Sequence, residues 1–220
     1  YVFAFTITGV FFFLSWASVS LTREPAVYSN KPVVSQVEYL RSLPEILRKD
    51  GNFRIYLLSQ IFFALGGMAT GFLVVYCAQT WDLPDAQASG VMIAWQAGLT
   101  LANLFFGFLS DRKGHKLSLE ICWLLSILAL ILAILAPNPW WFFPILFLSG
   151  AVSAGTFISG ISIVYEFTDP ENRPTYIGLA NTIPGIAVAI APLIGGWLAG
   201  AISYRWMFVL CSSLAATGGV

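Results

Sequence analysis

The sequence predicts an all-α polytopic membrane protein, and three observations lead to this class. Of the 220 residues, 58% are hydrophobic and only 10% are charged, whereas soluble domains average about 25% charged residues. Long apolar runs recur along the chain, and each could cross the ~30 Å hydrocarbon core of a bilayer as a helix. Lys and Arg gather in only some of the connections between these runs. A water-soluble globule would need far more polar surface than this chain offers.

Each apolar segment is expected to form a membrane-spanning helix. Between the first two segments lies a long polar connection, 22–55. Its stretch "VEYLRSLPEILRKDGNF" has apolar residues at near-helical spacing, which predicts an amphipathic helix on the membrane surface, interrupted near Pro44. The chain opens and stops inside apolar runs, so we expect a piece of a longer chain whose last helix is cut short. The segments are 1–21, 56–77, 87–109, 118–136, 140–166, 175–199 and 204–220.

The basic residues predict the orientation of these spans. If 22–55 and 107–117 share one side, only Arg205 among the 11 basic residues falls on the opposite side. The positive-inside rule then predicts that 22–55 and 110–117 are cytoplasmic. Four tryptophans are expected at the outer span ends: Trp81, Trp140, Trp141 and Trp206. The basic residues on the inner side are Arg23, Lys31, Arg41, Arg48, Lys49, Arg54, Arg112, Lys113, Lys116 and Arg173.

The stretch "GFLSDRKGHKLSL", 107–119, concentrates charge between two apolar runs. Gly107 suits a close approach of two helices, and Gly114 can supply a positive φ for the turn. Asp111 can accept hydrogen bonds from a neighbouring helix start. The stretch resembles the signature G-x-L-x-D-R-x-G-R-K-x-x-L of the major facilitator superfamily of secondary transporters. His115 departs from it, because arginine is usual there. The matching residues are Gly107, Leu109, Asp111, Arg112, Gly114, Lys116 and Leu119.

The resemblance implies twelve helices in two six-helix bundles. The long basic connection resembles the linker between the halves, and 140–166 lacks the arginine expected in a first half. The resemblance therefore implies that 1–21 is helix 6, 22–55 the cytoplasmic central linker and 56–220 helices 7–12. The N-terminal half of the same chain would be a partner. Two further stretches are similar to the family, "YRWMF" and the helix-packing stretch with Pro192, Gly195, Gly196 and Gly200.

For function, the resemblance implies secondary transport of a small solute by alternating access, as a permease or a drug or metabolite exporter in the plasma (inner) membrane. We expect Asp111 and Arg112 to join Glu166 and Arg173 in a charge cluster that steadies the outward-open state. The alternative is that these charges only set topology. A non-transporting sensor or scaffold of the same family also stays open.

Polar side chains inside the spans are candidates for a solute cavity. On 87–109, Gln96, Thr100 and Asn103 form one stripe beside Trp95, and Gln60 and Asn181 are further candidates. The competing interpretation is hydrogen bonding between helices, worth about 0.6 kcal/mol per contact. The small residues of 140–166, from Gly150 to Gly160, are expected to permit close packing. They include Ser153, Gly155, Thr156 and Ser159.

Several classes of function are disfavoured. A net charge of zero suggests no nucleic-acid partner, and the isolated Cys77, Cys122 and Cys211 suggest neither a disulfide framework nor a metal site. Catalytic groups do not cluster, so no enzyme activity and no cofactor are expected. No ionisable side chain falls near a span midplane, so proton or ion coupling is not indicated by these residues. An uncharged site favours a neutral, amphipathic or drug-like solute.

Overall fold

The computed structural model describes residues 2–23 and 36–219, and within them it contains helices and no strand. The chain divides into two compact units, 1–43 and 44–220. The first holds α1 (Val2–Ser20) and most of α2 (Gln36–Lys49). The predicted all-α polytopic fold is confirmed.

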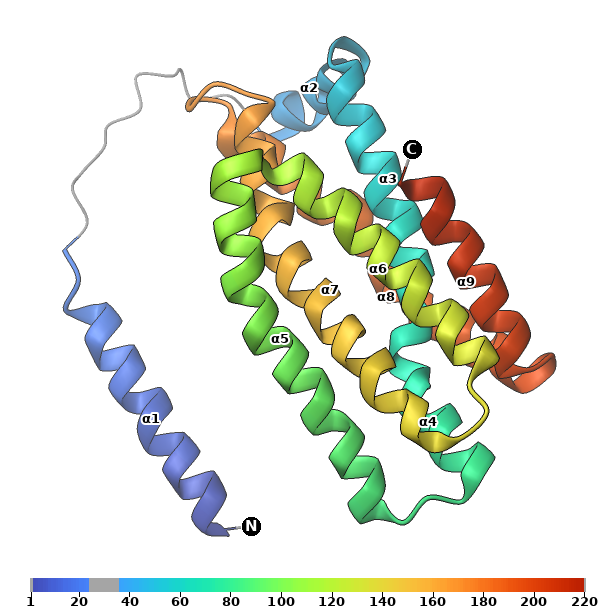
Figure 1. Cartoon of the computed structure of the whole chain (residues 1–220). Helices are drawn as coiled ribbons and strands as arrows, with labels where there is room; N and C mark the ends of the chain where they lie inside the picture. Colours follow the sequence, from blue (N-terminus) through green and yellow to red (C-terminus); the bar gives the residue numbers. More distant parts are fainter. Residues whose placement is uncertain (1, 24–35, 220) are drawn as a thin grey trace. The chain divides into compact units, whose positions relative to one another are not determined.

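The second unit is an up-and-down bundle in which successive spans run antiparallel (Figure 1). The first span is broken: its two α-helices are joined by a short 3-10 helix. A similar 3-10 helix ends the fourth span. The elements are α3 (Gly51–Gly66), η1 (Gly67–Ala69), α4 (Thr70–Trp81), α5 (Asp85–Lys113), α6 (His115–Leu135), η2 (Pro139–Trp141), α7 (Phe142–Ser162), η3 (Ile163–Glu166), α8 (Arg173–Ala201) and α9 (Tyr204–Gly218).

Five helical stretches of the described residues are long and apolar enough to cross a membrane. They correspond to the second to sixth predicted segments. The helices of the first and last segments are shorter, with an apolar stretch of Phe5–Ser20 in α1 and 15 residues in α9. The five are Gly51–Trp81, Ser89–Lys113, His115–Leu135, Pro139–Glu166 and Arg173–Ala201.

Local sequence explains where several helices begin and end. Asp50 caps α3, because its Oδ1 accepts from the Phe53 N–H at 2.9 Å. Ser203 caps α9 in the same way, accepting from the Trp206 N–H at 3.4 Å. Asp82 ends α4 in the left-handed conformation, with φ 47°. Gly114, with φ 89°, is the only residue between α5 and α6, so its predicted role in the turn is confirmed.

The expected interruption at Pro44 is wrong. α2 continues through Pro44 to Lys49, and the Asp50 N–H still bonds to the Ile46 carbonyl at 3.0 Å. Proline removes one backbone donor, but its fixed φ is compatible with a helix and the rest of the ladder remains.

Small residues decide how closely α5 and α7 approach, and this is the largest helix–helix contact of the bundle. A Cβ placed on Gly98 would collide with the Phe147 backbone, and one on Gly150 would collide with the Trp95 backbone. The close approach expected at Gly107 is wrong, because nothing lies within 4 Å of a Cβ built there. Gly107 lies on a part of α5 that no neighbouring helix of this bundle covers closely.

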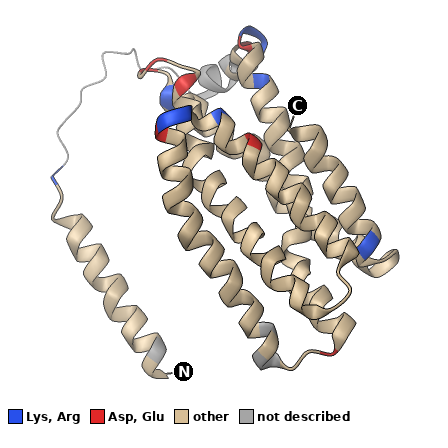
Figure 2. Ribbon diagram, viewed as in Figure 1, with Lys and Arg blue, Asp and Glu red and all other residues tan. Residues whose placement is uncertain are grey.

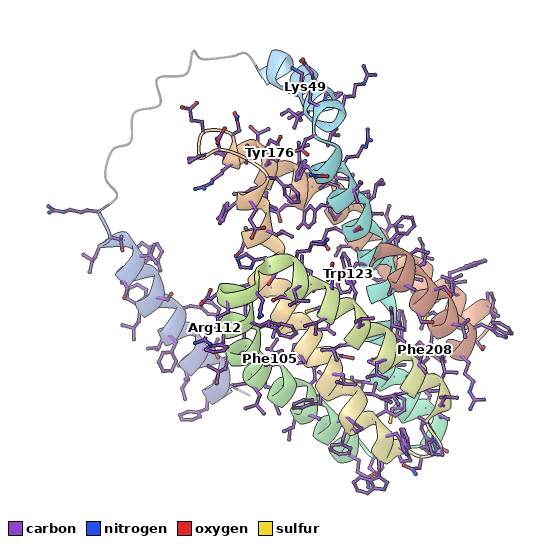
Figure 3. All side chains as sticks on the ribbon, turned by 45° about the horizontal axis from the view of Figure 1, so that its top comes forward. Lys49, Phe105, Arg112, Trp123, Tyr176 and Phe208 are labelled. Carbon is purple, nitrogen blue, oxygen red and sulfur yellow. The ribbon has the colours of Figure 1, made fainter. Side chains whose placement is uncertain are left out.

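The two ends of the bundle differ in charge. Lys, Arg, Asp and Glu gather at the end where α5 meets α6 and α3 begins (Figure 2); we call it the charged end. The four tryptophans predicted at outer span ends all lie at the opposite end, Trp81 at the close of α4, Trp140 and Trp141 in η2, and Trp206 in the first turn of α9. Figure 3 shows the same polarity, with Lys49 and Tyr176 at one end and Phe208 toward the other.

Candidate functional site

The signature stretch forms a tight corner rather than a loop. Asp111 and Arg112 lie in the last turn of α5, and Lys116 lies in the first turn of α6. All three side chains are exposed, whereas Leu119 is buried. The apolar positions of the motif therefore anchor the corner, and its charges face outward.

A buried hydroxyl cluster lies beneath this corner. Ser110 Oγ is 2.9 Å from Ser118 Oγ and 3.0 Å from Ser159 Oγ, so hydrogen bonds join α5, α6 and α7. His115 Nδ1 lies 3.4 Å from the same Ser159 hydroxyl. The residue that departs from the signature thus contacts a neutral hydroxyl. Nothing in the sequence predicts this cluster, because serines 49 residues apart give no local signal.

The four side chains of the predicted charge cluster form no ion pair with one another among the described residues. The Arg112 guanidinium lies 4.1 Å from the centre of the Phe108 ring. Arg173 lies 5.2 Å from the centre of the Tyr165 ring, and its buried Nε has no hydrogen-bond partner in the part of the chain that the structure describes. Glu166 is exposed at the end of η3. A proximity of Asp111 or Arg112 to Glu166 or Arg173 therefore stays a prediction.

A cavity of about 220 Å³ opens between α3, α7, η3 and α8. We call it the solute cavity, because two of its residues, Gln60 and Asn181, are among those expected to line one. Its polar lining comes from Tyr56, Gln60, Thr156 and Asn181, and Phe157 adds an aromatic ring that is 81% exposed. The remaining lining consists of Gly160 and aliphatic residues, so the cavity contains polar groups and no ionisable acid or base other than the phenol of Tyr56.

Two hydrogen bonds order the polar side of this cavity. Gln60 Nε2 donates to the Tyr56 hydroxyl at 2.8 Å, and that hydroxyl donates to the Gly160 carbonyl at 2.6 Å. Gln60 and Tyr56 are one turn apart on α3, so they share a face. The chain of bonds leads from the cavity into the last turn of α7.

The structure brings together only some of the predicted cavity residues. Gln60 and Asn181 line the same cavity, whereas the four residues on α5 do not. Gln96 and Thr100 bond to each other, with the Thr100 hydroxyl donating to the Gln96 carbonyl at 2.9 Å. Asn103 Nδ2 donates to the Leu99 carbonyl at 2.7 Å, and Trp95 packs against the core. Gln96, Thr100 and Asn103 thus each make hydrogen bonds within their own helix.

Sequence reasoning missed the other cavity residues, among them Tyr56, Thr156 and Gly160. All the small residues of α7, Thr156 and Gly160 included, were expected to permit close packing. The expectation is correct for Gly150 and Gly155, because a Cβ on either would collide with Trp95 or Cys122. Nothing lies within 4 Å of a Cβ built on Gly160. Tyr56 could have been predicted from its spacing, because it lies four residues before Gln60 and therefore on the same face of α3.

The residues of the helix-packing stretch on α8 differ in how closely other helices approach them. A Cβ on Gly195 would come within 2.8 Å of the Phe72 ring, and one on Gly196 within 3.8 Å. Gly200 has open space beside it, and Pro192 lines a cavity with Gly67 and Phe72 of the broken first span. Gly195 therefore fits the expected packing role best.

Comparison with known proteins agrees with this architecture. The family model of the Major Facilitator Superfamily matches residues 56–220. The chain belongs to the major facilitator superfamily. The signature corner, the bundle and the match cover the same part of the chain.

The matches to individual proteins cover only part of each sequence. The chain is 30% identical over 119 residues to the efflux pump hmp6 of Hypomyces subiculosus, which covers 53% of this chain and 21% of the pump. It is 34% identical over 123 residues to the rubrofusarin-specific efflux pump aurT of Gibberella zeae, covering 56% and 22%. It is 26% identical over 137 residues to the niacin transporter NiaP of Acinetobacter baylyi, covering 62% and 31%. The chain thus spans less than a third of the length of these relatives.

Proposed function

We propose that this chain is the C-terminal half of a secondary transporter that moves a small solute across the membrane by alternating access, as a permease or a drug or metabolite exporter. The observation that carries the proposal is the solute cavity, because it places uncharged polar groups inside a bundle of superfamily architecture. In alternating access, two bundles rock about a site at their interface. The N-terminal half of the same chain would supply the second wall.

The lining of the cavity favours a neutral or amphipathic organic solute. The amides of Gln60 and Asn181 both donate and accept hydrogen bonds, and the exposed Phe157 ring offers an aromatic face. No side chain in the lining carries a charge at neutral pH that would select an ion. Two relatives are named for the organic compounds niacin and rubrofusarin, which supports an organic solute.

The charged end is proposed to face the cytoplasm of a plasma (inner) membrane, with 22–55 as the central linker and 56–220 as helices 7–12. The charge asymmetry of the bundle supports this orientation. Asp111 and Arg112 would join Glu166 and Arg173 when the bundles close at this end, steadying the outward-open state. The buried Arg173 Nε supports the idea, because it has no hydrogen-bond partner among the described residues.

The test uses the full-length transporter in a strain that lacks its main drug-efflux pumps. Accumulation of a dye panel is compared for the wild type, Gln60→Ala and Asn181→Ala, with and without a protonophore. We expect either substitution to raise KM for an exported dye by about five- to thirty-fold, since each removes a hydrogen bond to the solute. Gln79→Ala, an exposed amide on α4 outside the cavity, is the matched control and should leave KM unchanged.

The same assay separates the alternative. A non-transporting sensor or scaffold would be well folded in the membrane and give no flux of any dye or of any solute in a wider uptake screen. Loss of export on collapse of the proton gradient would assign proton coupling, which would then have to come from residues outside the solute cavity.

A further inference from the structure

Tyr56 separates two cavities of the bundle. Besides the solute cavity, a second cavity of about 330 Å³ lies at the charged end between α3, α6 and η3; we call it the charged-end cavity. Its lining includes Ser59, Lys116, Glu120 and Phe167. Tyr56 lines both cavities, and no other described residue does. The Tyr56 side chain, only 8% exposed, is therefore part of the wall between them.

The hydroxyl of Tyr56 holds this wall to α7. It receives a hydrogen bond from Gln60 and donates to the Gly160 carbonyl at 2.6 Å. Gly160 lies one turn before η3, where the α-helical hydrogen-bond pattern tightens to 3-10. Such 3-10 turns are frequent at the ends of α-helices, so the bond to Gly160 fixes the place where α7 passes into η3. The same wall is completed by η3 itself, because Ile163 lines the charged-end cavity and Val164 lines the solute cavity.

Aromatic packing ties Tyr56 to the residue that follows η3. The ring centres of Tyr56 and Phe167 are 5.4 Å apart, and Phe53 stacks on Tyr56 at 6.2 Å. A movement of η3 must therefore displace the Tyr56 ring, and a rotation of Tyr56 must release both Gly160 and Phe167. Glu166, a member of the predicted charge cluster, is the last residue of η3.

We propose that Tyr56 is a positioning residue that couples the Gln60 amide in the solute cavity to the η3 segment at the charged end. A solute that bonds to the Gln60 amide competes with the Tyr56 hydroxyl for it. Loss of that bond frees Tyr56 to turn, which opens the wall and unlocks η3. The inference rests on the proposed function, because it takes the solute cavity as the place where the solute binds.

The first experiment needs no solute. Hydrogen exchange of the backbone in 160–167 is measured by mass spectrometry on the full-length protein in lipid nanodiscs. Tyr56→Phe keeps the ring and removes both hydroxyl bonds, so exchange in this segment should become about three- to ten-fold faster. Gln60→Ala removes only the bond to Tyr56 and should give about a two-fold increase. The double variant should match Tyr56→Phe, because the two bonds act in series.

Two control variants make the result specific. Asn181→Ala lines the solute cavity without a hydrogen bond to Tyr56 and should leave exchange in 160–167 unchanged. Tyr204→Phe removes a tyrosine hydroxyl at the opposite end of the bundle and should also have no effect. The proposal is overturned if Tyr56→Phe exchanges like the wild type, or if Asn181→Ala has the same effect as Tyr56→Phe.

A transport readout distinguishes positioning from binding. For a dye that the wild type exports, Tyr56→Phe should lower the maximal rate by about five-fold or more. KM should fall or stay within about two-fold, because the solute no longer competes with Tyr56 for the Gln60 amide. A rise in KM with an unchanged maximal rate would overturn the coupling role and make Tyr56 a binding residue. If the wild type transports no dye and no solute of the wider uptake screen while the exchange results hold, the proposed function fails and the mechanical link between Gln60 and η3 stands.

Discussion

The two faces of α7 pack in opposite ways. Toward α5 and α6, α7 presents Gly150 and Gly155, whose missing side chains let neighbouring backbones and a cysteine approach to contact. Toward α3 and α8, it presents Thr156 and Gly160 to an open cavity. One helix thus belongs to a close-packed seam and to a hollow, polar face.

The difference teaches how one bundle combines rigidity with movement. Without a hydrophobic driving force between helices in lipid, close backbone approach and buried hydrogen bonds hold a seam together. The seam has both, whereas the cavity face has empty volume, two 3-10 segments and prolines in α8. Local opening costs least where contacts are few, so we expect the cavity face to move and the seam to stay fixed.

The largest expected effect comes from filling the seam. Gly150→Val would place side-chain atoms on the Trp95 backbone, and we expect a loss of at least about 3 kcal/mol of stability, seen as aggregation in detergent. Thermal unfolding followed by size-exclusion chromatography measures it. Gly160→Ala on the other face is the control and should unfold at or slightly above the wild-type temperature, since no described residue lies within 4 Å of its Cβ and alanine favours a helix over glycine. Equal damage from both variants would contradict the distinction between the faces.

The next effect concerns transport. Asp111 is exposed and makes no ion pair among the described residues, so Asp111→Asn should leave the unfolding temperature unchanged. If the charge cluster forms in the outward-open state, the substitution should lower the transport rate about ten-fold, equivalent to ~1.4 kcal/mol. Asp82→Asn at the opposite end is a matched control. Normal transport by Asp111→Asn would contradict the charge cluster and would mean that these charges only set the topology of the spans.

A smaller effect tests the hydroxyl cluster that closes the seam at the charged end. Ser159→Ala removes the partner of the Ser110 hydroxyl and of His115, and we expect a loss of about 1 kcal/mol of stability. Ser110 keeps its bond to Ser118, which limits the cost. Ser153→Ala, whose hydroxyl bonds within α7 at 3.0 Å to the Ser149 carbonyl, is the comparison, and chemical denaturation in mixed micelles measures both.

The smallest effect lies outside both faces, on α2. Lys49 Nζ is 2.8 Å from Glu45 Oε1, and the hydrogen bond and positive charge of Lys49 lower the pKa of Glu45 below its ordinary value. The pair's contribution is therefore present above the unfolded pKa of a glutamate and is lost as the pH falls through the lowered value. The protection of 44–49 against hydrogen exchange, corrected for the intrinsic exchange rate at each pH, should fall slightly in acid, and Glu45→Gln should abolish that loss of protection. Because both side chains are exposed, the change should be smaller than the effect of Ser159→Ala.

Much of the fold could be predicted because its determinants are local. Span positions follow from apolar length, and Gly114 follows from the need for a positive φ between two helices. The signature residues from Gly107 to Leu119 sufficed to identify the family. The sequence did not predict that α5 continues past 109 to Lys113 or that α3 begins before 56, at Gly51. At a membrane surface, charged residues can continue a helix as easily as they can end one.

The site was harder to predict, because it depends on which faces meet. Gln96 and Asn181 are equally polar in sequence, yet Asn181 lines the solute cavity and Gln96 bonds within its own helix. Small residues were ambiguous in the same way. Gly150 and Gly160 lie on the same helix among similar residues, yet only Gly150 lies against a neighbouring backbone. Each residue of a helix is turned by about 100° from the one before it, so its position decides whether it faces a neighbouring helix or a cavity. In a helix that is apolar on all sides, the sequence pattern does not show which face meets the neighbour.

The sequence by itself therefore determined the class, the spans and the charge asymmetry, since each depends on the transfer of a segment between water and lipid. It also determined the family, through the signature motif. Only the tertiary structure decided that Gly98 and Gly150 form the seam, that Gln60 and Asn181 share a cavity, and that Tyr56 lies between two cavities. These depend on the packing of helices distant in sequence. In a bilayer both faces of a helix are apolar, so hydrophobicity does not reveal which face is buried.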